Sequence, residues 1–111
     1  MPKIVTLNEN RDFRRLYRKN NSLVSPALVV YYSNTHAGFS RLGITVSKKV
    51  GKAVKRNRAK RVIRVAYSSL LPKFNKDVDL VIVARVRATV LSSDEITRQL
   101  ETLLKKAQII D

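Results

Sequence analysis

Apolar residues recur along this chain with two different spacings, and each spacing predicts a different kind of element. Phe13, Leu16 and Tyr17 lie at positions i, i+3 and i+4, so they share one face of a helix that runs to about Lys19. The same spacing returns between Lys55 and Leu71 and predicts a second helix. The apolar side of this second helix is formed by Ala59, Val62, Ile63, Ala66 and Leu70.

Polar residues indicate where two of the helices begin. Asn8 or Asn10 can cap the first helix, because either side chain can accept a hydrogen bond from a free backbone N–H. Ser92 and Glu95 form a capping box, in which Ser92 accepts from the Glu95 amide and Glu95 can reach back. A last helix therefore follows Ser92, and its apolar face carries Ile96, Leu100, Leu103, Leu104 and Ala107.

Runs of β-branched and aromatic residues predict the strands. Residues 27–32 and 39–46 flank a turn at 34–38, so they predict an antiparallel pair. The segment 79–84 is a run of apolar β-formers rather than an alternation, which predicts a strand buried on both faces. The order is helix, strand, strand, helix, strand, helix, and a further short strand can lie within 27–47. The fold class is a mixed α/β domain.

The charge of the chain predicts a polyanionic partner for this domain. The net charge is +15, and no Asp or Glu occurs between Phe13 and Lys76, a stretch with sixteen Lys or Arg. Nine of these basic residues fall within the seventeen positions from Lys48 to Arg64. Such a density binds nucleic acid on charge alone, and an anionic membrane is the other general polyanion.

Composition also limits the number of domains and the compartment. At 111 residues, without repeats or linkers, the chain reads as a single domain, 1–111. It has no cysteine, and its longest apolar run is far shorter than the ~20 residues that span a bilayer. The first ten residues lack the apolar block of a signal peptide. We therefore expect a cytoplasmic protein with no membrane partner.

The basic run has a plain alternative, a solvated helix face, but its composition favours nucleic-acid binding. Solvated helices usually mix charge signs to gain i,i+4 pairs, and this segment contains no acid. In its core, Lys55–Arg61, Arg outnumbers Lys, and Arg binds phosphate with a bidentate fork. Asn57 adds a neutral group that donates and accepts. Without a zinc signature or a leucine heptad, the mixed α/β pattern fits RNA better than duplex DNA.

Aromatic residues form a second candidate surface. Phe13 and Tyr17 share a helix face, while Tyr31 and Tyr32 are neighbours in a strand and must face opposite sides. Only one of these two tyrosines can therefore join the helix aromatics. Core packing is the alternative role, and for Phe13 the two roles are about equally favoured. Aromatics beside a basic surface can stack unpaired bases, each worth ~1–3 kcal/mol.

The chain offers few groups for catalysis. His36 is its single histidine and lies in a predicted turn, where solvation is more common than catalysis. Asp77 and Asp79 can form a carboxylate pair, but they read as loop residues before a strand. No nucleophile triad, P-loop or metal cage follows from the motifs. We expect no catalytic residue and no metal site on the protein.

The stretch from Arg41 to Arg64 resembles a known family. Its sequence, RLGITVSKKVGKAVKRNRAKRVIR, is closely similar to the protein subunit of bacterial ribonuclease P, whose signature is the Arg-Asn-Arg core at 56–58 followed by Lys-Arg at 60–61. Weaker matches extend the resemblance over essentially the whole chain. It implies a two-layer α/β (α+β) sandwich of αβββαβα order, ribosomal S5 domain 2-like, with a four-stranded sheet. It also implies a left-handed βαβ crossover, against the usual right-handed rule.

The resemblance also implies a function. The family protein binds a large catalytic RNA and assists endonucleolytic removal of the 5′ leader from precursor tRNA, while the RNA and its Mg²⁺ ions carry the chemistry. The protein is expected to be monomeric without RNA. The implied leader-binding cleft is lined by Phe13, Tyr17 and Tyr31, with Tyr17 standing where phenylalanine is common. The implied contacts to the catalytic RNA are Lys48, Lys49, Lys52, Lys55, Arg56, Asn57, Arg58, Lys60, Arg61 and Arg64.

Two other functions stay open on the residues alone. A non-catalytic RNA-binding module of a ribosomal or RNA-assembly type would use the same basic helix. A nuclease with its own metal-dependent activity would depend on Asp77 and Asp79, and the sparse carboxylates disfavour it.

Overall fold

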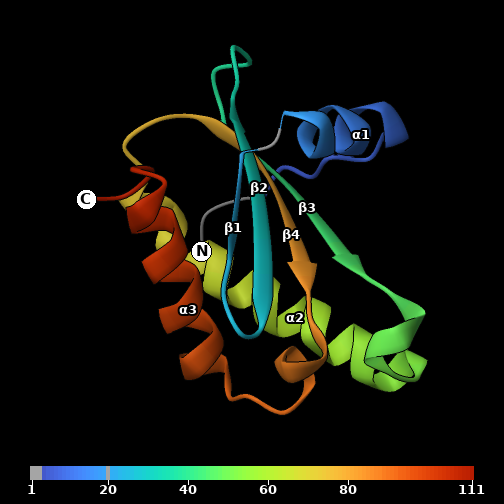
Figure 1. Cartoon of the computed structure of the whole chain (residues 1–111). Coiled ribbons are helices and arrows are strands. Elements are labelled where there is room, and N and C mark those ends of the chain that lie inside the picture. Colours follow the sequence, from blue (N-terminus) through green and yellow to red (C-terminus); the bar gives the residue numbers. More distant parts are fainter. Residues whose placement is uncertain (1–3, 20) are drawn as a thin grey trace.

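The computed structural model describes residues 4–19 and 21–111. Its helices and strands are α1 Asn10–Arg18, β1 Ser22–Val24, β2 Leu28–Asn34, β3 Arg41–Val46, α2 Ala53–Leu70, β4 Val78–Ala84 and α3 Ser93–Lys106. Helices α2 and α3 form a layer on one face of the sheet, and α1 packs on the opposite face (Figure 1). The expected αβββαβα order is confirmed.

The four strands form one mixed sheet in the order β1-β2-β4-β3. Strand β2 runs antiparallel to β1 and β4, whereas β3 runs parallel to β4. The expected antiparallel pair of 27–32 with 39–46 was therefore wrong, because β4 lies between β2 and β3. The extra short strand, β1, lies at 22–24 and therefore upstream of the interval 27–47 in which we expected it. Its three residues are too few to show a period of two, which is why the pattern missed it.

The connection from β3 to β4 passes through α2 and is left-handed. In Figure 1 both strands run downward, β4 lies to the left of β3, and α2 crosses behind the sheet. A right-handed crossover would place the helix in front. This geometry puts the basic helix on the face of the sheet opposite α1.

Alternation along β2 and β4 divides the apolar residues between two cores. Val30, Leu80 and Ile82 belong to the large core beneath α2 and α3 and are at most 1% exposed. Val81 faces the other way and forms a small core with Leu16 of α1. Six of the seven residues of β4 are buried, so the expectation of a strand buried on both faces is confirmed.

The helix ends differ from the expectation at one place. Glu9 occupies the N-cap position of α1 and makes no side-chain capping bond, so the proposed caps Asn8 and Asn10 were wrong. Asn8 instead accepts a hydrogen bond from the Thr6 hydroxyl at 3.1 Å. The cap of α3 is as expected, because the Ser92 hydroxyl accepts from the Glu95 amide at 3.2 Å.

Candidate nucleic-acid interface

Helix α2 holds most of the predicted RNA-binding residues on a rigid, outward surface. Ala59, Ile63 and Ala66 are at most 1% exposed and pack into the large core, which turns the opposite arc toward solvent. Arg56 and Arg58 are half-buried. The exposed members of the predicted set are Lys48, Lys49, Lys52, Lys55, Asn57, Lys60, Arg61 and Arg64.

The basic residues of α2 gather at the helix end that disfavours cations. Lys52, Lys55 and Arg56 lie at its N-terminus, and the first turn contains no acid. The helix macrodipole places about half a positive charge there, so each cation costs ~0.3–1 kcal/mol. The free N–H groups of the same turn attract anions. A phosphate bound at this end would relieve the repulsion, so the arrangement fits an anionic partner.

Arg58 differs from its neighbours because its guanidinium already has intramolecular partners. Its two terminal nitrogens donate to the carbonyl oxygens of Thr89 and Leu91, each at 3.3 Å. These carbonyls belong to the segment that joins β4 to α3. Arg58 therefore ties α2 to this connection, a role that its place in the basic run did not reveal.

The three predicted cleft aromatics lie together between α1 and the sheet. The rings of Tyr17 and Tyr31 meet edge to face with centroids 4.8 Å apart. The Tyr17 hydroxyl also lies 3.2 Å from the Thr45 hydroxyl. Phe13 and Tyr31 pack against the small core, whereas Tyr32 packs against the large core on the other face. Of the two neighbouring tyrosines, Tyr31 is thus the one that joins Phe13 and Tyr17.

Gly43 makes room for Phe13 on β3. A Cβ atom at this position would lie 2.6 Å from Cζ of Phe13, which is closer than any real contact. The glycine therefore lets the tip of the Phe13 ring approach the strand closely. Sequence reasoning missed this role, although a glycine inside a strand pattern is a known signal of close approach.

A cleft of about 640 Å³ opens beside these aromatics at the β3 edge of the sheet. Phe13, Tyr17 and Thr45 line it together with Lys60 of α2. Tyr31, the third residue of the predicted cleft, is not among the lining residues, because its ring packs against Tyr17 and the small core. A second hollow of about 320 Å³ shares Phe13 and Lys60 and adds Arg64. The sequence predicted separate aromatic and basic surfaces, whereas the structure brings them together through these two basic side chains.

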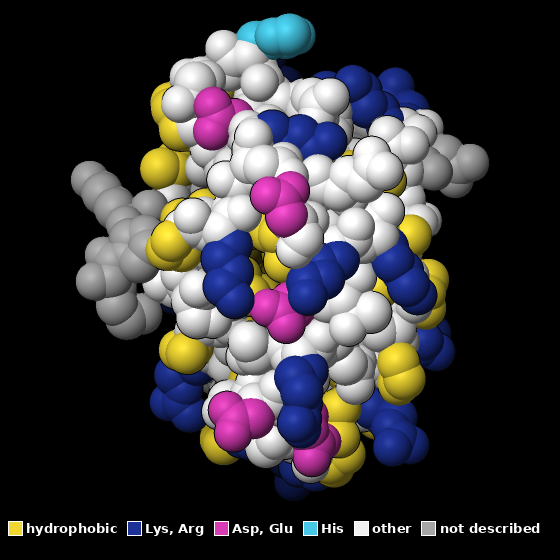
Figure 2. All heavy atoms as spheres, turned by 90° about the vertical axis from the view of Figure 1, so that its left-hand side faces the viewer, with side chains coloured by type: hydrophobic (Ala, Val, Ile, Leu, Met, Phe, Trp, Pro, Cys, Tyr) yellow, Lys and Arg dark blue, Asp and Glu magenta, His cyan; other side chains and the backbone are white. Residues whose placement is uncertain are grey.

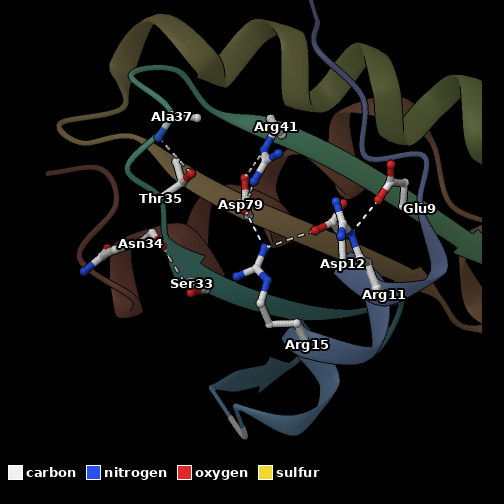
Figure 3. A network of polar contacts seen from close by, with 10 residues as sticks. All are labelled: Glu9, Arg11, Asp12, Arg15, Ser33, Asn34, Thr35, Ala37, Arg41 and Asp79. Carbon is white, nitrogen blue, oxygen red and sulfur yellow. Dashed lines mark hydrogen bonds and ion pairs between the residues drawn. The ribbon is translucent and has the colours of Figure 1, made fainter.

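A buried carboxylate ties α1 to the sheet next to this cleft (Figure 3). The side chain of Asp79 on β4 is 1% exposed and accepts two hydrogen bonds from Arg41, at 2.7 and 2.8 Å. It accepts a third from Arg15 of α1 at 2.9 Å. The hydrogen bond to Asp79 raises the pKa of Arg41, against an opposing effect of burial. This network fixes the orientation of α1.

The same network argues against a nuclease centred on the two aspartates. Asp79 lies inside β4 rather than in a loop, and both of its carboxylate oxygens already accept hydrogen bonds from arginines. Asp77 is exposed. Among the residues that the structure describes, no group of three or more His, Cys, Asp or Glu side chains could hold a metal ion. His36 is exposed in the turn between β2 and β3, as expected.

The face around α3 has a different character. Figure 2 shows acidic and basic side chains interspersed on that side of the molecule. Asp94, Glu95 and Glu101 all belong to α3, together with Arg98 and Lys105. This mixed charge is typical of a solvated surface, so α3 offers no continuous basic area to a polyanion. Within the described ranges, no helix is both long and apolar enough to cross a membrane.

The chain is similar to known proteins in both sequence and structure. The model of the ribonuclease P family matches residues 1–108. The ribonuclease P protein component of Alkaliphilus oremlandii is 38% identical over 111 residues, which cover 100% of this chain and 97% of the relative. The RNase P protein of Staphylococcus aureus has a TM-score of 0.87 at 35% identity, covering 98% and 100%. The Thermotoga maritima protein has a TM-score of 0.81 at 30% identity, covering 91% and 96%.

A four-stranded α+β fold with a basic helix beside an aromatic cleft is typical of a small RNA-binding protein. The family match over nearly the whole chain shows which family of RNA-binding proteins this is. The chain belongs to the ribonuclease P protein family, whose members are the protein subunit of a tRNA-processing endoribonuclease and work with an RNA subunit. The open alternative of a ribosomal or assembly module is thereby set aside.

Proposed function

We propose that this protein binds the 5′ leader of precursor tRNA in the aromatic cleft while α2 holds the catalytic RNA. The observation that carries the proposal is the meeting of Phe13 and Tyr17 beside Lys60 in a cleft open to solvent, with the Tyr31 ring packed edge to face against Tyr17. Aromatic rings stack on unpaired bases, and a lysine binds the phosphates that join the nucleotides. Single-stranded nucleic acid can present unpaired bases and phosphates to the cleft at the same time.

The cleft aromatics are held in place before any RNA arrives. Phe13 lies against Gly43, Tyr17 is held by its contact with Thr45, and the Asp79 network fixes α1. Binding therefore requires little further ordering of the protein, which conserves binding free energy. Each stacked base would contribute ~1–3 kcal/mol, so two bases would raise precursor affinity by at least tenfold.

The basic surface of α2 serves the RNA subunit. The exposed side chains from Lys48 to Arg64 bind phosphates and release counterions, which makes the contact salt-dependent. Neutralised phosphates also let RNA strands approach each other more closely. Hydrolysis itself falls to the RNA subunit with its bound Mg²⁺. The protein's part is to hold the RNA and the leader, and it would do so as a monomer in the cytoplasm.

A matched pair of phenylalanine variants tests the leader assignment. Phe13→Ala removes a cleft wall, whereas Phe39→Ala removes an exposed phenylalanine from the turn after β2. In holoenzyme reconstituted with the catalytic RNA, Phe13→Ala should lower the affinity for precursor tRNA about tenfold and leave the affinity for mature tRNA almost unchanged. Phe39→Ala should change neither.

Equal losses for precursor and mature tRNA in the Phe13→Ala holoenzyme would contradict the leader assignment. Unfolding of each variant in urea separates this outcome from a damaged fold, because a correctly folded variant retains the slope of the wild-type transition.

A further inference from the structure

The outward side of α1 carries a basic pocket that is separate from both surfaces described so far. An open hollow of about 580 Å³ is lined by Arg11, Arg15, Arg18 and Lys19, with Asp12 as its single acid. We call these five residues the α1 basic pocket. Asp12 pairs with Arg15 at 3.7 Å, and Glu9, outside the pocket, pairs with Arg11 at 2.6 Å, so two carboxylates oppose four cations. The pocket therefore offers a net positive surface to an anion.

The pocket adjoins the aromatic cleft around a single helix. Successive residues turn by ~100°, so Arg18 and Arg11 lie ~40° and ~60° from Arg14 around the α1 axis. Arg14 itself lines the cleft with Phe13 and Tyr17. A nucleic-acid strand that leaves the cleft across Arg14 therefore lies directly beside the α1 basic pocket. Helix α2 packs on the other face of the sheet (Figure 1), and it reaches the cleft at the β3 edge through Lys60.

The pocket has a fixed element as well as mobile ones. Arg15 is anchored by the buried carboxylate of Asp79 at 2.9 Å, which leaves most of its donors unused (Figure 3). Arg18 and Lys19 are exposed and can adjust to a ligand. An anchored guanidinium beside flexible cations suits a chain of phosphates, because arginine grips one phosphate with a fork while neighbouring cations follow the backbone.

We propose that the α1 basic pocket binds backbone phosphates of the 5′ leader upstream of the nucleotides held in the aromatic cleft. This inference rests on the proposed function of the cleft. It extends the leader contact from bases at the cleft to phosphates beyond it, and it needs no base-specific group. Longer leaders gain affinity from the pocket, whereas leaders that fill only the cleft do not.

The test uses holoenzyme and precursor tRNAs with leaders of graded length. The variant Arg18→Ala/Lys19→Ala removes two pocket cations and leaves the Arg15–Asp79 pair intact. The matched control Arg98→Ala/Lys105→Ala removes the same charge from exposed positions on α3. The pocket variant should lose roughly three- to tenfold in affinity for long leaders and nothing for short ones. Its salt slope for long leaders should flatten by ~0.7 per lost contact.

Two outcomes would overturn the inference. An equal loss at every leader length, or for mature tRNA, would mean that the pocket contacts structured RNA instead. No loss beyond that of the α3 control would mean that the pocket is a solvated surface. Failure of the proposed function is distinguishable, because Phe13→Ala would then weaken binding of precursor and mature tRNA equally in the same series, so that the wild-type preference for leader-bearing precursor would remain.

Discussion

Replacing Asp79 by alanine should loosen α1 and destabilise the protein. Removing one partner of a fully buried ion pair costs ~3–5 kcal/mol, because the other charge is left without a partner. Arg15 and Arg41 keep 36% and 28% of their side-chain exposure, so water screens the charges left behind. We therefore expect the free energy of unfolding to fall by ~2–3 kcal/mol.

Urea unfolding followed by circular dichroism measures this change. With a slope of ~1–3 kcal/mol per molar urea, the midpoint should fall by about 0.7–3 M. Asp77→Ala is the matched control, because it removes the same charge from an exposed site two residues away. It should change stability by less than ~0.5 kcal/mol. The Asp77→Ala control also removes one negative charge, so it measures how much stability is lost merely because the net charge rises above +15.

A double-mutant cycle locates the effect on α1. Arg15→Ala alone should cost ~1 kcal/mol, and combined with Asp79→Ala it should cost less than the sum of the two. Additive losses, or an Asp79→Ala variant as stable as the Asp77→Ala control, would refute the conclusion that this carboxylate holds α1 on the sheet.

Further substitutions test the other contacts. Gly43→Ala should cost ~1–3 kcal/mol and weaken leader-bearing precursor, because the new methyl group must displace the Phe13 ring; wild-type affinity would contradict that contact. Arg58→Ala should lower the free energy of unfolding by ~1–2 kcal/mol, whereas Arg61→Ala should leave it unchanged and instead flatten the salt slope for the catalytic RNA by ~0.7–0.9. If Arg61→Ala lowered stability and Arg58→Ala changed only the salt slope, the assignment of Arg58 to the fold and Arg61 to the RNA would be contradicted. Tyr17→Phe should keep the ring contact and cost at most ~1 kcal/mol, and a larger loss of precursor affinity would give the hydroxyl a direct role.

Sequence periodicity predicted the larger elements because each buries an apolar face long enough to show its spacing. The apolar side of α2 is an example, since Ala59, Ile63, Ala66 and Leu70 are all at most 2% exposed. Strand β1 is too short for such a signal. The left-handed crossover came from the family resemblance, because general chirality rules favour the opposite hand.

The candidate site was predicted in its parts but not in its assembly. Residue types marked the basic helix and the aromatics, yet spacing could not show that Lys60 reaches the aromatic cleft. The pairing of Asp79 with Arg15 and Arg41 was also hidden, because its partners lie 64 and 38 positions away. A polar residue before an apolar run resembles a loop residue until the strand register is known.

Crosslinking within the holoenzyme tests the central claim most directly. A photoreactive nucleotide placed in the 5′ leader of precursor tRNA, next to the cleavage site, would be activated by light and the attached peptide identified by mass spectrometry. The structure predicts crosslinks to the peptides that contain Phe13 or Tyr17, and their loss when the leader is absent. Crosslinks confined to α3, or to the basic arc of α2, would contradict leader binding in the aromatic cleft.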